Sequence, residues 1–146
     1  MEVQIKSESI KKEIKLDLKE AKYATGRRKK SVARVWLKKG SGKFYVNDKK
    51  MTDYFIKPNL QTAIYRPLIL VKRENEFDVR CTVKGGGLTG QAGAIVHGLA
   101  RAIVEFEPDL KLVLKKEKLM TRDSRIVERK KYGRKKARRG FQFSKR

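Results

Sequence analysis

The stretch FDVRCTVKGGGLTGQAGAIVHGLARAIVEF, residues 77–106, joins a strand pattern to a helix pattern through three consecutive glycines. Apolar and polar residues alternate from Phe77 to Lys84, which predicts a half-buried strand. From Leu88 onward, apolar residues recur at steps of three and four, which predicts an amphipathic helix ending near Pro108. These apolar positions are Ala92, Ile95, Leu99, Ile103 and Phe106. A strand leading into a helix favours an α/β or α+β domain.

The glycines also match the dinucleotide-binding pattern G-x-G-x-x-G at Gly85, Gly87 and Gly90. That fold needs a further strand after the helix, with an acidic residue about twenty positions beyond the loop. Glu105 has the right offset but lies on the same helix, and the next segment is again helical. A P-loop would need Lys and then Ser or Thr where Gln91 and Ala92 stand. A mononucleotide or dinucleotide site is therefore disfavoured.

A structural role for the glycines is the better interpretation. Residues 85–87 would let the strand turn sharply at positive φ. Gly90, Gly93 and Gly98 would leave one helix face bare for close packing. The free amides at the helix start still favour an anion, so the phosphates of a polymer could bind there.

The rest of the predicted body is a small sheet of about four strands with packed helices. A β-rich run around residues 32–36 halts at KKGSGK and resumes at residues 44–46, which predicts a hairpin turning at Gly40, Ser41 and Gly42. LILVK, residues 68–72, and residues 77–84 are the other two strands. Helices are predicted within residues 48–55, 58–67 and 108–119, the second one starting at Pro58 and ending at Pro67.

The composition predicts a polyanionic partner. The chain has 146 residues, about one domain, with 39 Lys plus Arg against 16 Asp plus Glu, a formal charge of +23. Its apolar fraction of 39% still supports a folded core. Nucleic acid phosphates are the best match for such a charge. No apolar run approaches the roughly 20 residues of a membrane span, so we expect a soluble protein without a membrane partner.

The charge distribution divides the chain into three parts. Residues 1–22 form an N-terminal extension, a flexible arm or short helix whose acidic residues argue against a signal or transit peptide. Residues 23–120 form the globular domain. Residues 121–146 form an extended basic tail, in which ten of the last eighteen residues are Lys or Arg and none is acidic. Three aromatic residues in this tail could stack on unpaired RNA bases: Tyr132, Phe141 and Phe143.

No catalytic or metal-binding pattern is present in the sequence. His97 has neither a nucleophile nor a second ligand at motif spacing, which favours packing or hydrogen bonding in the helix. Cys81 is expected to be a small buried strand residue in a reducing compartment. Asp123 and Glu128 lie among Arg122, Arg125 and Arg129, where local ion pairing is expected. We therefore predict no enzyme, no cofactor and no small-molecule substrate; a nucleotide-dependent oxidoreductase and a general nucleic-acid packager are the rival functions.

Three segments resemble the family of bacterial-type small-subunit ribosomal protein S9, also called uS9. They are GRRKKSVARV at residues 26–35, VKGGGLTGQAGAIVHGLARAI at 83–103 and TRDSRIVERKKYGRKKARRGFQFSKR at 121–146. The resemblance covers about residues 22–146. It implies a ribosomal S5 domain 2-like fold with a left-handed βαβ crossover, contrary to the general rule, and a long basic tail. The sequence departs from many relatives at Val96, where they carry Arg, and in its N-terminal extension.

The resemblance also implies partners and contact residues. The partners are 16S-type ribosomal RNA in the subunit head, neighbouring head proteins and the peptidyl-site tRNA, in a bacterial cytoplasmic ribosome or, as a second choice, an organellar (mitochondrial) one. Ser144, Lys145 and Arg146 should contact the tRNA. The implied rRNA-binding residues are Arg27, Arg28, Lys29, Lys30, Arg122, Arg125, Arg129, Lys130, Lys131, Arg134, Lys135, Lys136, Arg138 and Arg139.

Overall fold

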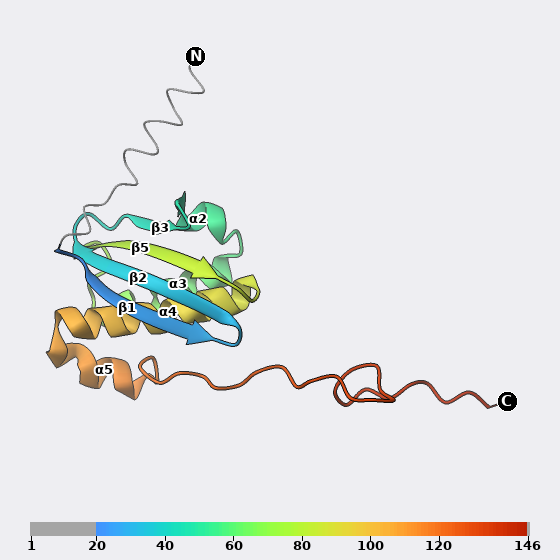
Figure 1. The fold of residues 1–146 in the computed structure, drawn as a ribbon. Coiled ribbons are helices and arrows are strands. Elements are labelled where there is room, and N and C mark those ends of the chain that lie inside the picture. The colour runs from blue at the N-terminus through green and yellow to red at the C-terminus, as the bar shows by residue number, and fades with distance from the viewer. Residues whose placement is uncertain (1–19, 146) are drawn as a thin grey trace, which may run out of the picture.

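The computed structural model describes residues 20–145, which form a mixed α/β body followed by an extended C-terminal segment (Figure 1). The strands are β1 (Lys22–Arg28), β2 (Ser31–Lys39), β3 (Phe44–Val46), β4 (Lys49–Lys50) and β5 (Phe77–Lys84). The helices are α2 (Met51–Tyr54), α3 (Pro58–Leu70), α4 (Leu88–Phe106), the 3₁₀ turn η2 (Pro108–Leu110) and α5 (Lys111–Lys116). The predicted α/β class is confirmed. Most of the predicted N-terminal extension, and Arg146, lie outside the described residues.

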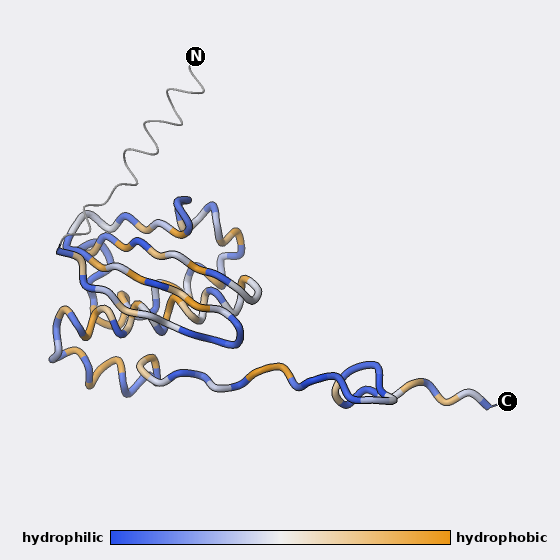
Figure 2. The backbone as a smooth tube through the Cα atoms, in the orientation of Figure 1, coloured by the Kyte–Doolittle hydropathy of each residue, from blue (hydrophilic) through white to orange (hydrophobic). Residues whose placement is uncertain are grey.

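The five strands form one sheet in the order β1-β2-β5-β3-β4, rather than the predicted four. β2 pairs antiparallel with both β1 and β5, whereas β3 lies parallel to β5. Alternate residues such as Val35, Leu37 and Cys81 are almost fully buried on one face of the sheet. The helices α3 and α4 cover this face (Figure 1), and the buried apolar core includes residues of the strands and of both helices. Apolar positions alternate with hydrophilic ones along these elements (Figure 2). As predicted, Cys81 is a buried strand residue, and its burial raises the pKa of the thiol.

The predicted hairpin between the run around residues 32–36 and residues 44–46 is wrong, because β5 lies between β2 and β3. The loop of residues 40–43 passes over the N-terminal end of β5. There, Asp78 Oδ1 accepts hydrogen bonds from the backbone amides of Ser41 (2.8 Å) and Lys43 (2.9 Å). Turn-forming residues correctly predicted a change of direction, but they carry no information about which strand the chain meets next.

The prediction of a strand at LILVK is also wrong, because α3 continues through Pro67 to Leu70. Proline inside a helix removes one backbone hydrogen bond and usually ends the helix. Here Ile64 and Leu68, four residues apart on one helix face, are both almost fully buried in the core. Their burial favours one more helical turn and outweighs the local preference.

The turn before α4 and the packing of α4 on β1 both depend on glycine. Gly85 (φ 75°) and Gly86 (φ 63°) adopt the predicted left-handed conformation, whereas Gly87 (φ −108°) is extended and caps the helix. Further along α4, Gly98 lies directly against Gly26 of β1. A Cβ atom on Gly26 would overlap the carbonyl of Ala94 and the amide of Gly98. The backbones of β1 and α4 are therefore in contact without side chains between them.

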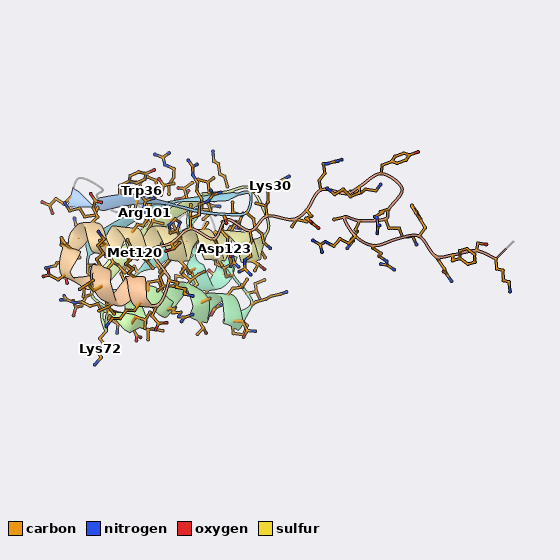
Figure 3. All side chains as sticks on the ribbon, turned by 90° about the horizontal axis from the view of Figure 1, so that it is seen from below. Lys30, Trp36, Lys72, Arg101, Met120 and Asp123 are labelled. Carbon is orange, nitrogen blue, oxygen red and sulfur yellow. The ribbon has the colours of Figure 1, made fainter. Side chains whose placement is uncertain are left out.

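The segment after α5 contains no helix or strand between residues 117 and 145 and leaves the body near the turn between β1 and β2 (Figure 3). It is largely hydrophilic, with short apolar patches (Figure 2). No helix within residues 20–145 is long and apolar enough to cross a membrane.

Candidate nucleic-acid interface

The turn between β1 and β2 places four consecutive cations at one end of the sheet. Arg28 pairs with Ser31, so Lys29 and Lys30 form a two-residue turn. Lys29 adopts a left-handed φ of 52°, a conformation that favours glycine. Arg27, Lys29 and Lys30 are exposed, and Figure 3 shows Lys30 at the tip. This turn therefore presents several charges to solvent at a point where the backbone is tightly bent.

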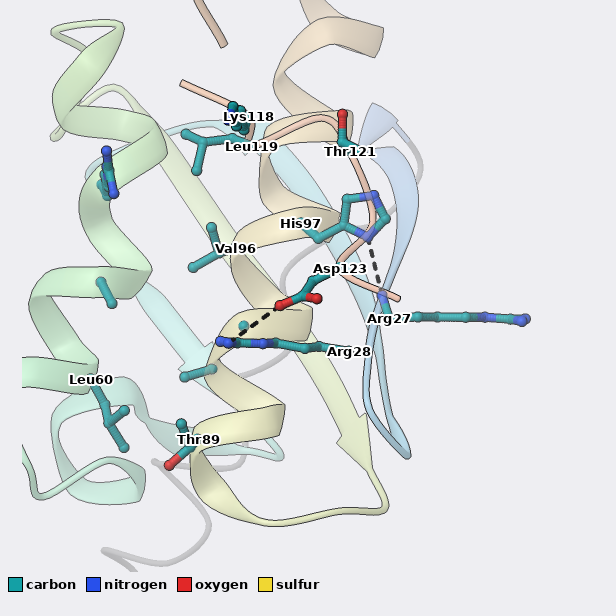
Figure 4. Close-up of a pocket in the computed structure, with 14 residues that line it drawn as sticks. Arg27, Arg28, Leu60, Thr89, Val96, His97, Lys118, Leu119, Thr121 and Asp123 are labelled. Atoms are coloured by element: carbon teal, nitrogen blue, oxygen red, sulfur yellow. Dashed lines mark hydrogen bonds and ion pairs between the residues drawn. The ribbon is translucent and has the colours of Figure 1, made fainter. Parts of the chain in front are cut away.

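Arg28 points the other way, toward α4. Its side chain crosses Gly93, where any Cβ atom would collide with it, and its Nη2 atom lies 3.6 Å from Asp123 Oδ2 (Figure 4). Its Nε atom is buried and has no hydrogen-bond partner among residues 20–145. The two side chains line a pocket of about 360 Å³ between α3, α4 and residues 118–123. Arg28 thus joins the turn to the start of the C-terminal segment.

Asp123 is also held in place by Arg125, which belongs to the same segment. It accepts hydrogen bonds from the backbone amide of Arg125 (3.0 Å) and from that residue's Nε (3.0 Å) and Nη2 (2.9 Å) atoms. These bonds with Arg125, and the charges of Arg125 and Arg28, lower the pKa of the Asp123 carboxyl to about 2. Asp123 therefore stays ionised and fixes residues 121–125 against the body.

We expect Asp123→Asn to release this attachment without unfolding the body. A carboxyl whose pKa is lowered by folding stabilises the folded form above its ordinary pKa of about 3.9, and this stabilisation is lost as the pH falls to about 2. In the wild type, the NMR signal of the Arg28 guanidinium, the group of the body that Asp123 reaches, should therefore shift between about pH 4 and pH 2. In the variant it should already have the detached shift at neutral pH.

The matched control is Glu117→Gln, which removes the carboxylate that pairs with Arg66 at 2.7 Å. It should leave the Arg28 signal and its pH profile unchanged. Identical profiles for the wild type and Asp123→Asn would contradict the attachment.

His97 connects the same two segments from within α4. Its Nδ1 atom accepts a hydrogen bond from the backbone amide of Arg27 at 3.3 Å (Figure 4), and its ring lies close to the backbone of Met120. Burial, and then the charge of Arg101, lower the pKa of His97, so the ring is neutral at neutral pH. The predicted hydrogen-bonding role agrees with this geometry.

Arg101 is a basic residue of this region that the sequence reading missed. Its Nη1 atom donates a hydrogen bond to the carbonyl of Thr25 at 2.6 Å. With Arg27, His97 and Arg122 it lines a second pocket of about 300 Å³. The available signal was its spacing, because it lies one helical turn after His97 and therefore on the same face of the predicted helix.

The acidic residues of the C-terminal segment form ion pairs, as predicted, but with partly different partners. Glu128 bonds to Arg138, at 2.9 Å from Nε and 3.2 Å from Nη2. Asp123 reaches Arg28 on β1 as well as its neighbour Arg125. Within the loop between Glu128 and Arg138, Arg134 Nη1 donates to the carbonyl of Arg138 at 2.7 Å.

The predicted contact residues thus fall into two groups. The structure brings Arg27–Lys30 close to the segment containing Arg122 and Arg125. The basic residues from Arg129 to Arg139 lie on the extended segment, away from the body, and Ser144 and Lys145 lie near its far end (Figure 1). The described residues contain no group of three or more His, Cys, Asp or Glu side chains that could hold a metal ion.

The glycine turn does not lie in a dinucleotide-binding architecture. In the part of the chain that the structure describes, α4 is followed by η2 and α5, and no further strand joins the sheet. A comparison with known protein families matches residues 26–146, most of the chain, to the family described as ribosomal protein S9/S16. The match includes both basic regions described above. The chain therefore belongs to the ribosomal protein S9/S16 family and is a structural protein of the small ribosomal subunit.

Proposed function

We propose that the body binds small-subunit ribosomal RNA through one basic surface, made by the turn between β1 and β2 and the start of the C-terminal segment. The contact between Arg28 and Asp123, at 3.6 Å, is the observation that carries this proposal, because it joins two cationic segments far apart in sequence. Arg27, Arg101 and Arg122 line one pocket of that surface. Arginine suits such a surface because its guanidinium can donate to two phosphate oxygens at once.

The C-terminal segment supplies a second RNA contact. From residue 129 to 145, only Arg138 forms an ion pair with another described residue. So many uncompensated charges repel one another in the free protein and gain free energy by displacing counterions from phosphates. Tyr132 and Phe143 are highly exposed and can stack on unpaired bases. The segment therefore orders within folded RNA while the body docks on its surface.

The end of the segment contacts the peptidyl-site tRNA through Ser144, Lys145 and Arg146. Contacts of this kind hold a phosphate backbone without reading its sequence. The resemblance to the S9 family supports this role, as it supports the S5 domain 2-like topology, contacts with neighbouring head proteins and a bacterial ribosome.

We expect deletion of residues 144–146 to separate the two RNA roles. Subunits should still incorporate the shortened protein, because the basic surface and residues 129–139 are intact. Their affinity for peptidyl-site tRNA should fall several-fold, since charged contacts each contribute about 1 kcal/mol or more. Sucrose-gradient sedimentation measures incorporation, and filter binding of tRNA to purified subunits measures the affinity.

Unchanged tRNA affinity would refute the role of the end of the segment, and loss of incorporation would refute its separation from rRNA binding. The same gradient tests the rival functions. A general nucleic-acid packager would not sediment stoichiometrically with small subunits, and an oxidoreductase would instead show saturable binding of NAD.

A further inference from the structure

One face of the sheet is not covered by the helices. Along β1, β2 and β5, the residues that alternate with the core positions point away from α3 and α4. Cross-strand pairing places Tyr23 opposite Trp36, and Trp36 opposite Arg80, in one row across this open face. Figure 3 shows Trp36 on the side of the sheet opposite the helices. Two aromatic rings thus lie side by side on an accessible sheet surface.

Arg34 holds these rings in a single cluster. The ring centroids of Tyr23 and Trp36 are 5.4 Å apart, and the guanidinium carbon of Arg34 lies 5.2 Å from the Trp36 ring and 5.6 Å from the Tyr23 ring. Arg34 Nε also donates a hydrogen bond to the Tyr23 hydroxyl at 3.2 Å, and this hydroxyl bonds to Thr25 at 3.0 Å. The cluster has defined geometry, while Tyr23 and Arg34 remain exposed.

The charge around the cluster suits a polyanion. The open face of β1, β2 and β5 also carries Arg27, Lys38, Arg80 and Lys84. Arg80 is paired with Asp48 at 2.9 Å, and the one acidic residue on this face, Asp78, accepts hydrogen bonds from the loop of residues 40–43. Cations without an ion-pair partner among the described residues therefore flank the aromatic cluster.

We propose that this open face binds an unpaired RNA base, stacked on the cluster of Tyr23, Arg34 and Trp36, with its neighbouring phosphates on the flanking cations. A flat π-system and a guanidinium plane both favour stacking of bases. Paired bases in a duplex cannot offer their faces in this way. The inference rests on the proposed RNA binding, but it assigns a site separate from the C-terminal segment.

Trp36 is the only tryptophan in the chain, so its fluorescence reports on this face alone. In the full-length protein, an unstructured single-stranded RNA should quench this fluorescence saturably. An RNA duplex of the same length, and inorganic polyphosphate, should bind without comparable quenching. Fluorescence anisotropy of the labelled RNAs measures total binding in parallel.

Substitution of Trp36 separates stacking from charge. Trp36→Val keeps a strand-forming apolar residue and should weaken single-stranded RNA binding about tenfold, with little effect on the duplex. Trp36→Phe keeps a ring and should retain most of the affinity. Circular dichroism checks that both variants are folded.

The outcomes distinguish this inference from the proposed function. RNA that binds without quenching Trp36, and with equal affinity to Trp36→Val, would overturn the stacking site and leave RNA binding in place. No binding of any RNA would overturn both.

Discussion

Gly26→Ala should destabilise the body by about 3 kcal/mol, a large part of the stability of a small domain. The added methyl group would overlap the backbone of α4 at Ala94 and Gly98 rather than a side chain that could rotate away. The strand and the helix must therefore separate, which opens the core around Ala24 and Val35. Urea denaturation should show a lower midpoint with an unchanged slope, because the unfolded state is the same.

Gly140→Ala is the matched control. Gly140 has an ordinary φ and nothing within 4 Å of the position of a Cβ atom. This substitution should change the free energy of unfolding by less than about 0.5 kcal/mol. Equal midpoints for the two variants would mean that β1 does not pack on α4 as closely as described.

The close packing of Gly26 against α4 also explains why the sequence did not predict β1. The residues of β1 that face the core are Ala24 and Gly26, which are small because α4 approaches so closely. A strand of this kind lacks the β-branched and aromatic residues that usually mark one. By contrast, β5 and α4 alternate large apolar residues with polar ones or repeat them at helical spacing, and both were predicted with nearly correct bounds.

The wrong predictions share a physical cause. LILVK is apolar and β-branched enough for a strand, but the burial of Ile64 and Leu68 against the core extends α3. The loop of residues 40–43 was correctly predicted as a turn, yet pairing with β5 decides where β3 lies. Both depend on contacts between distant segments, which local patterns do not encode.

The candidate RNA-binding site, like the fold, could be predicted from the sequence only in part. Composition alone identifies the cations of the two basic segments, because charge density does not depend on the fold. That Arg28 meets Asp123, and that Tyr23 lies beside Trp36, follows only from the packing of α4 and the register of β1 with β2. The sequence therefore predicts the class of ligand, and the fold decides which residues can act together on it.

Replacing Arg129, Lys130 and Lys131 together by alanine should weaken binding to ribosomal RNA about a hundredfold near 0.1 M salt. None of the three forms an ion pair with another described residue, so their charges are available to phosphates. If each one contacts a phosphate, the slope of log K against log salt should become shallower by about two to three. Anisotropy of a labelled head-domain RNA over a salt series measures both quantities, and sedimentation should show reduced incorporation into subunits.

A loss of net charge alone could also weaken RNA binding, so the control must remove the same charge elsewhere. Lys49, Lys50 and Lys57 are exposed; the first two form β4, at the opposite edge of the sheet from β1, and Lys57 immediately precedes α3. Their triple alanine variant has the same net charge as the first variant. If long-range attraction dominates, the two variants should lose equal affinity and show similar slopes. If residues 129–131 contact phosphates directly, only the first variant should release fewer counterions and show the shallower salt slope. Charged side chains that stay hydrated displace no condensed ions, so removing them leaves the slope unchanged.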